Sequence, residues 1–434
     1  MVSRKTLMNV RIPLAKPEIT DSDREAVLAV LRTPHLSMGP KLGEFEQAFC
    51  DYTGSKYVVA VNSGTSALHL AVRALGVEPG AEVILPSFTF SALLNVILQE
   101  GLKPKFVDID PTTYNTTPEI IAAAITLRTR LILAVHTFGF PVDVEALQEV
   151  ATHPGSSRTG PRSTSPSTSL RASARRAGPR HTGHTIHLIE DACEAVGAEV
   201  RGRKAGSLGE AGLFAFYPNK QITTGEGGAL VTSNEQLARH AAQLRNQGRD
   251  SSQDWHQHAE IGFSYRLSDI NCALGISQLD RIEQVVERRQ KLAEIYDREL
   301  ADVAEIIRPP VTSRVGRISW FIYPVQLTEE FSTKHRDWIC ESLRSKGIGT
   351  GRYFAPLHLQ PVLKTLPFAQ NAKEWGTQNR ASGTPADVSS RLRQTEFVAD
   401  RLIALPFFNE LTEAEIQEVC GALEESVCEL RRKM

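Results

Sequence analysis

The sequence predicts an α/β fold around a mostly parallel central sheet, and three observations support this prediction. Short apolar runs recur from residue 57 onward, each about as long as a buried strand. The stretches between them space their apolar residues as helices do. Strands that alternate with helices favour a parallel sheet covered on both faces. Such sheets bind ligands at the carboxyl ends of their strands, so candidate site residues are expected there.

The elements follow one another regularly along the first part of the chain. Strands are expected over the apolar runs at 57–62, 81–87, 103–110, 130–139, 186–192 and 229–233. Helices are expected over the amphipathic stretches at 66–76, 90–101 and 117–126 and, as one long helix, at 267–300. Gly76 stands where the first of these helices should stop.

The chain divides into a large domain, residues 1–274, and a smaller C-terminal α+β domain, residues 275–434. Two polar stretches interrupt them, at 152–185 and 369–395. The first is rich in Ser, Thr, Pro, Gly and Arg, a composition that cannot bury a core, so we expect a disordered surface insert that catalysis does not need.

Composition excludes several classes of protein. The chain has 434 residues, 41% hydrophobic and 23% charged, and a formal net charge of -1, so no global field attracts nucleic acid or anionic lipid. No apolar run is long enough for a signal peptide or a membrane helix. The six cysteines form no C-x-x-C pair, which argues against a zinc site or a disulfide framework. The simplest expected location is the cytoplasm, with the thiols reduced.

Three stretches carry residues suited to chemistry. In "NSGTSALHL" (62–70), Gly64 permits a tight turn and a helix begins near Thr65, which offers backbone N–H groups to a phosphate; an ordinary Ser/Thr helix cap is the alternative. In "LIEDACEAVGA" (188–198), Glu190 and Asp191 end an apolar strand, and alternation lets only one of them face a given site. A helix-capping acid is the alternative there.

The third stretch is "FAFYPNKQITTGEGGALVT" (214–232). Its lysine, Lys220, could attack a carbonyl and form a Schiff base, or it could be a solvated or phosphate-binding lysine. Together, a phosphate cup, a carboxylate and an amine are what pyridoxal 5′-phosphate needs, because they hold its phosphate, keep its ring nitrogen protonated and bond its aldehyde. Aromatic residues in "PSFTF" (86–90) could stack on its ring.

These motifs resemble those of the DegT/DnrJ/EryC1/StrS sugar aminotransferases, within fold type I of the pyridoxal-phosphate enzymes. The resemblance runs from about residue 12 to residue 419, apart from the two polar stretches. It rests on the combination of "NSGTSALHLA", "PSFTF", "FVDIDPTTYN", "HTFGFPVDVEAL", "EDACEAVGA", "FAFYPNKQITTGEGGALVT", "YRLSDINCALGISQLDRI" and "GRYFAPLHLQP".

The resemblance implies a role for each matching residue. Lys220 is the Schiff-base lysine and Asp191 the partner of the ring nitrogen. Gly64 and Thr65 bind the phosphate, and Phe90 stacks on the ring. It also places Glu194 near the ring's phenolic oxygen and lets Ser264 reach the phosphate bound by the neighbouring subunit. Tyr353 and His358 are placed near the substrate, and structural roles are the alternative for both.

Three positions depart from the family pattern. Ala215 stands where many relatives have Ser, Ser264 where many have Asn, and Glu194 where Gln or His is usual. The first two changes weaken phosphate binding by about 1 kcal/mol for each lost hydrogen bond. None of the three removes a group that the chemistry requires.

The resemblance implies a homodimeric aminotransferase with shared active sites. The enzyme is expected to move an amino group from glutamate to a nucleotide-linked keto sugar. Its product is expected to serve the biosynthesis of amino sugars for cell-surface polysaccharides. A sugar dehydratase of the same family is the nearest alternative, but such relatives carry His at the position of Lys220. A non-catalytic protein that binds pyridoxal phosphate is another. A metal site at His181, His184 and His187 is conceivable, but two of the three lie in the polar insert, and no metal site is expected.

Overall fold

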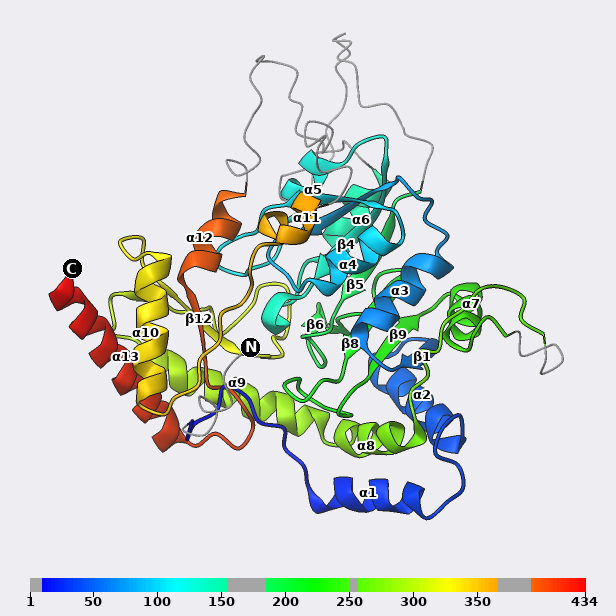
Figure 1. Ribbon diagram of the computed structural model, residues 1–434, viewed down its shortest axis with the longest axis horizontal. Coiled ribbons are helices and arrows are strands. Elements are labelled where there is room, and N and C mark those ends of the chain that lie inside the picture. The colour runs from blue at the N-terminus through cyan, green and yellow to red at the C-terminus, as the bar shows by residue number, and fades with distance from the viewer. Residues whose placement is uncertain (1–9, 154–184, 250–256, 366–391) are drawn as a thin grey trace, which may run out of the picture.

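The computed structural model of the chain describes residues 10–153, 185–249, 257–365 and 392–434 (Figure 1). Its centre is a seven-stranded sheet with the strand order β1-β9-β8-β5-β4-β2-β3. The strands are β1 (Tyr57–Val61), β2 (Glu82–Pro86), β3 (Lys103–Val107), β4 (Thr129–Val135), β5 (His187–Asp191), β8 (Ala211–Ala215) and β9 (Gly228–Thr232).

The mostly parallel character of the sheet is confirmed. All the pairings from β8 through β5, β4 and β2 to β3 are parallel. Only β9 runs the other way, antiparallel to both β1 and β8. The carboxyl ends of six strands therefore meet at one edge of the sheet, joined there by the start of β9.

Helices cover both faces of the sheet, and strand alternation explains why. In β1, Val58 and Ala60 pack into one core while Val59 and Val61 pack into another. The first core is covered by α2 (Pro40–Thr53), α5 (Pro118–Ala124), α6 (Val144–Thr152) and α8 (Asp269–Leu279). The second is covered by α3 (Gly64–Ala74), α4 (Ala92–Gln99) and α7 (Glu235–Arg245).

A smaller antiparallel sheet organises the C-terminal part (Figure 1). It contains β10 (Ile306–Ile307), β11 (Tyr323–Leu327) and β12 (Leu402–Leu405), with α10 (Thr333–Ser345), α12 (Arg393–Arg401) and α13 (Glu413–Lys433) around it. The short helix α11 (Pro361–Thr365) lies elsewhere, and its Leu363 packs against the second core of the central sheet. A short hairpin of β6 (Glu199–Val200) and β7 (Arg203–Lys204) lies earlier in the chain.

The core of the C-terminal part also takes in residues from the first half of the chain. Phe88, Phe138 and Phe140 pack into it, and Ile12 forms a bridge with Ile348. The predicted domain boundary between residues 274 and 275 falls inside α8. The division into two domains stays a prediction.

The single long helix expected at 267–300 is wrong, because the structure contains two helices there. Helix α8 ends at Leu279, and α9 (Ile282–Glu299) begins three residues later. Arg281 between them has φ -115° and ψ 12°, outside the helical range. Its guanidinium forms an ion pair with the buried carboxylate of Asp23 at 2.8 Å.

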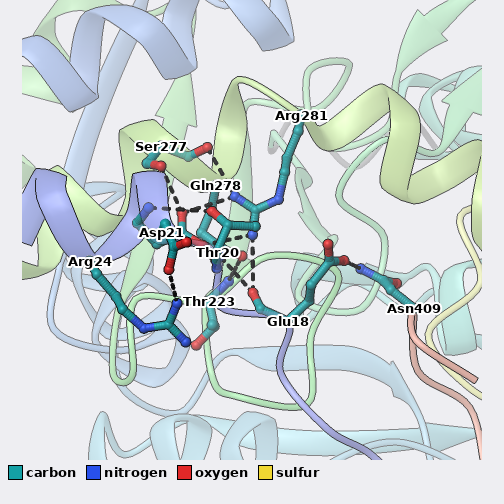
Figure 2. Close-up of polar contacts among 10 residues, drawn as sticks. Glu18, Thr20, Asp21, Arg24, Thr223, Ser277, Gln278, Arg281 and Asn409 are labelled. Atoms are coloured by element: carbon teal, nitrogen blue, oxygen red, sulfur yellow. Dashed lines mark hydrogen bonds and ion pairs between the residues drawn. The ribbon is translucent and has the colours of Figure 1, made fainter.

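That ion pair anchors the N-terminal helix α1 (Asp21–Leu31) beside α8 (Figure 1). Figure 2 shows Gln278 and Arg281 close to Thr20, the residue that caps α1. Asp23 is fully buried, and its carboxylate accepts hydrogen bonds from Arg281, Gln278 and Ser277. Burial opposes its ionisation, but the bonds from Arg281, the Thr20 N–H and Ser277 outweigh it and hold the pKa of Asp23 well below its ordinary value.

The expectations for the two polar stretches concern residues that lie outside the described ranges, except at 152–153, 185 and 392–395. Residues 393–395 begin helix α12. Among the helices of the described residues, none combines the length and apolar character needed to cross a membrane.

Candidate active site

A cavity of about 360 Å³ opens at the carboxyl edge of the central sheet. It lies where β1, β2, β4, β5 and β8 end and where β9 begins. Six of the residues predicted from the cofactor's needs and the family pattern line it, together with one predicted substrate residue: Gly64, Thr65, Phe90, Asp191, Glu194, Lys220 and Tyr353.

The turn from β1 into α3 forms one end of the cavity. Ser63 caps the helix, since its Oγ accepts the Ser66 N–H at 3.1 Å. The N–H groups of Gly64 and Thr65 have no partner within the helix, because the first turn of any helix lacks acceptors. A Cβ at Gly64 would lie 2.9 Å from both the Ala215 Cβ and the Cys193 Sγ, so only glycine fits there.

The paired carboxylates at the end of β5 separate as strand alternation predicts. Asp191 lines the cavity, is 7% exposed, and accepts the Cys193 N–H at 3.0 Å. Glu190 does not line the cavity. Its carboxylate is fully buried and accepts four bonds, from the N–H groups of Gly206, Leu208 and Gly209 and from His136 Nε2.

Lys220 extends from a tight turn, in which its N–H donates to the Tyr217 carbonyl at 2.9 Å. Its Nζ lies 3.5 Å from Glu194 Oε1 and 4.1 Å from the centre of the Phe321 ring. The lysine and glutamate side chains are only 13% and 12% exposed. Lys220 therefore lies inside the cavity and not on the molecular surface.

The second carboxylate oxygen of Glu194 is fixed by the backbone, because Oε2 accepts the Phe138 N–H at 2.9 Å. Burial raises the pKa of Glu194, and the Lys220 ammonium and the Phe138 N–H only partly oppose this. The carboxyl group thus sits where its charged and neutral forms are closer in free energy than in water.

Aromatic side chains line the outer part of the cavity. Phe90 is 59% exposed and Tyr217 is 51% exposed, so both present ring surface to solvent and to the cavity. Tyr353 is more enclosed; burial raises its pKa to about 12, and its hydroxyl is hydrogen-bonded to Asn219.

Two predicted site residues do not line this cavity. The His358 ring forms hydrogen bonds to Ser87 Oγ at 2.7 Å and to the Glu396 carboxylate at 3.2 Å, which ties the loop after β2 to α12. Ser264 is exposed and forms a bridge with Asn246. A substrate contact of His358 and a contact of Ser264 with a neighbouring subunit remain predictions.

The structure adds lining residues that the sequence did not single out. Phe321 precedes β11 in an apolar run, where nothing distinguishes it from a core residue. Cys193 and Asn219 are the sequence neighbours of the predicted residues Glu194 and Lys220, and this adjacency could have identified them. His136, one residue after β4, stands at the carboxyl end of a strand, where a search for polar residues could have found it.

No group of three or more metal-ligating side chains lies together in the parts of the chain that the structure describes. His181 and His184 of the possible metal motif fall outside those parts. His187 is described, and its Nδ1 lies 2.7 Å from the Glu210 carboxylate.

A model of the DegT/DnrJ/EryC1/StrS aminotransferase family matches residues 17–156 and 181–424. The chain belongs to this family. The match leaves out residues 157–180, which lie within the polar stretch predicted as an insert. The enzyme is accordingly an aminotransferase that depends on pyridoxal 5′-phosphate.

Individual relatives extend over nearly the whole aminotransferase. It is 35% identical over 416 residues to the GDP-perosamine synthase of Caulobacter vibrioides, and the alignment covers 96% of this chain and 98% of that relative. The structure of the aminotransferase TlmJ from Streptoalloteichus hindustanus is 27% identical, covers 97% of this chain and 100% of its own, and has a TM-score of 0.79.

A further solved structure matches at the level of the fold alone. The PLP-form of the putative sugar aminotransferase Spr1654 from Streptococcus pneumoniae is 24% identical, covers 96% of this chain and 99% of its own, and has a TM-score of 0.81. These similarities confirm the predicted fold type I architecture.

The cavity of this aminotransferase fits its cofactor. Unpaired N–H groups at the start of α3 suit a phosphate, and the absence of a Cβ at Gly64 lets the helix approach closely. The Asp191 carboxylate suits a protonated ring nitrogen, and the Lys220 amine lies in the same cavity.

Proposed function

We propose that this aminotransferase moves an amino group from a donor to a keto sugar linked to a nucleoside diphosphate. We expect the donor to be glutamate. The observation that carries the proposal is that the Lys220 amine and the Asp191 carboxylate face one cavity at the edge of the sheet. The substrate class is supported by the relative from Caulobacter vibrioides, which is named for a GDP-linked product.

Each site residue has a distinct task in this proposal. Pyridoxal phosphate, when bound, would supply a sink for electrons from the substrate carbon. Lys220 would hold the cofactor through its amine, and its Nζ would also take a proton from the substrate and give it back. The Asp191 carboxylate would keep the ring nitrogen protonated.

The remaining residues bind and orient. The N–H groups of Gly64 and Thr65, together with the Thr65 hydroxyl, hold the phosphate against the positive end of α3. Phe90 would stack on the ring, and Glu194 would lie near its phenolic oxygen. Tyr353 contacts the substrate from the C-terminal part of the chain.

The alternatives are less well supported. A sugar dehydratase of this family would carry His where this chain has Lys220. A non-catalytic protein that binds the cofactor would not need an enclosed lysine beside a carboxylate, which the cavity contains.

We further propose that the enzyme is a cytoplasmic homodimer that serves the synthesis of amino sugars for cell-surface polysaccharides. Ser264 would reach the phosphate bound by the partner subunit. Its exposure on this chain, away from the chain's own cavity, is compatible with such a contact.

The test is a panel of nucleotide-linked keto sugars incubated with glutamate and the cofactor-loaded enzyme. Mass spectrometry should reveal an amino-sugar product and one equivalent of 2-oxoglutarate for at least one sugar. Release of water from the sugar without retention of nitrogen would instead identify a dehydratase. Turnover of simple 2-oxo acids alone, with no sugar accepted, would contradict the proposed substrate class.

A further inference from the structure

The Lys220 amine lies between a carboxylate and an aromatic face. Glu194 Oε1 is 3.5 Å from Nζ, within ion-pair distance, and the Phe321 ring centre is 4.1 Å away. Phe321 is 2% exposed, so the ring excludes water from that side. A cation is attracted to the face of an aromatic ring, and more strongly where water is excluded.

Both partners of Lys220 are fixed in place by their own hydrogen bonds. The Phe138 N–H donates to Glu194 Oε2 at 2.9 Å, and the Phe138 carbonyl accepts the Phe321 N–H at 3.1 Å. Arg289 donates to the Phe321 carbonyl at 3.1 Å. The carboxylate and the ring therefore share one backbone anchor, so their separation is set by the fold.

The residue after Lys220 completes this arrangement. Gln221 is 2% exposed, and its Nε2 donates to the Glu194 carbonyl at 2.7 Å and to the Ser319 carbonyl at 2.8 Å. One side-chain amide thus links the lysine loop to the segment that carries Glu194 and to the segment that carries Phe321.

We propose that Glu194 stabilises the ammonium that Lys220 becomes when it takes a proton from the substrate, and that Phe321 positions the amine against Glu194. This inference rests on the proposed function, in which Lys220 must act as a base. When the proton moves, the C–H bond of the substrate breaks, an N–H bond forms at Nζ, and the electron pair of the broken bond stays on the substrate side. The new positive charge then lies beside the Glu194 carboxylate and over the Phe321 ring.

The charges of Glu194 and Lys220 are coupled. Burial raises the pKa of the Glu194 carboxyl group, and the nearby Lys220 ammonium opposes that rise. The other titratable groups that line the cavity are His136, Asp191, Cys193, Tyr217, Glu226 and Tyr353. Among the described residues, Glu194 is the only carboxylate found within ion-pair distance of Lys220.

The experiment measures the reactivity of the Lys220 amine as a function of pH in the full-length chain freed of cofactor. A lysine-selective acylating reagent is applied, and the labelling of Lys220 is counted by mass spectrometry. Only the neutral amine reacts. Because Glu194 stabilises the ammonium, Glu194→Gln should move the midpoint of the profile down by about 1–3 pH units, and Phe321→Leu should move it in the same direction by less.

Glu226→Gln is the matched control, because it removes a carboxylate from the same cavity at an exposed position. Its profile should equal that of the wild type. An unchanged midpoint in Glu194→Gln, with near-native circular dichroism, would overturn the inference. If that variant fails to fold without cofactor, Phe321→Leu gives the second reading, and an unchanged profile there would overturn the positioning role.

This readout is independent of the proposed function. Failure of the sugar panel would leave the labelling profiles unaffected, whereas an unchanged profile would leave the amination of a sugar intact. In the loaded enzyme, the pH dependence of the cofactor's visible absorbance should shift in Glu194→Gln and stay unchanged in Glu226→Gln.

Discussion

Glu190 and Asp191 are consecutive in β5, yet their carboxylates serve opposite faces of the sheet. Glu190 is enclosed by four hydrogen-bond donors, and Asp191 lines the cavity. The same functional group is therefore structural at one position and available for chemistry at the next. The two can be separated experimentally, because one should control stability and the other activity.

Glu190→Gln should destabilise the fold. The amide nitrogen of Gln cannot accept the bonds that one carboxylate oxygen now accepts, and each buried donor left unpaired costs about 1–3 kcal/mol. Urea unfolding of the cofactor-free protein at pH 7 measures the loss. Stability equal to that of the wild type would show that the surrounding N–H groups find other acceptors.

Asp191→Asn should keep the fold and some cofactor affinity while losing most of the rate. An amide cannot hold a proton on the ring nitrogen, and loss of one such electrostatic contact reduces kcat by about 10²–10³-fold. Steady-state kinetics and unfolding of the same preparation separate the two effects. A variant as fast as the wild type would transfer the role to another residue.

The buried pair of Asp23 and Arg281 should stabilise the docking of α1. Removing one partner of a buried ion pair costs about 3–5 kcal/mol, so Asp23→Ala should lower the free energy of unfolding by that order. Asp21→Ala is the matched control in the same helix. Its exposed pair with Arg24 should be worth less than about 1 kcal/mol.

The same pair predicts a dependence of stability on pH. The folded-state pKa of Asp23 lies well below its unfolded value, so its contribution is present above about pH 4 and is lost as the pH falls toward the folded value. Asp23→Asn should therefore flatten the loss of stability between about pH 5 and pH 2. An equally steep loss in that variant would assign the effect to other carboxylates.

Ser264 tests the proposed sharing of active sites. Ser264→Asn should tighten pyridoxal phosphate binding by about 1 kcal/mol, roughly fivefold in Kd, because it supplies a hydrogen bond to the partner's phosphate. Ser264→Ala should not tighten it. Sedimentation should show a dimer, and a stable active monomer would rule the sharing out.

Much of the fold was predictable because local patterns and the sheet agree. The apolar runs that end at Val61, Pro86, Val107, Val135 and Asp191 are all strands of the central sheet. The break between α8 and α9 was not predictable, since both sides have helical periodicity. At the break, Arg281 forms a tertiary ion pair with Asp23, which is far away in the sequence.

The candidate site divides in the same way. Gly64, Asp191 and Lys220 each lie at a strand end or a turn, where the sequence marks them. Phe321 reaches Lys220 from about 100 residues away, in an apolar run that predicts only burial. His358 resembles a substrate residue in sequence, but its ring is engaged by Ser87 and Glu396, which only the packing of α12 reveals.

The central claim is that Lys220 carries the chemistry, and Lys220→Ala tests it most directly. Lys204→Ala is the control, because Lys204 pairs with Glu199 and Glu283 and does not line the cavity. Turnover of the accepted sugar and the visible absorbance of bound cofactor are measured on both variants. We predict that Lys220→Ala abolishes turnover and the wild-type absorbance band while Lys204→Ala keeps both; wild-type turnover in Lys220→Ala would contradict the claim.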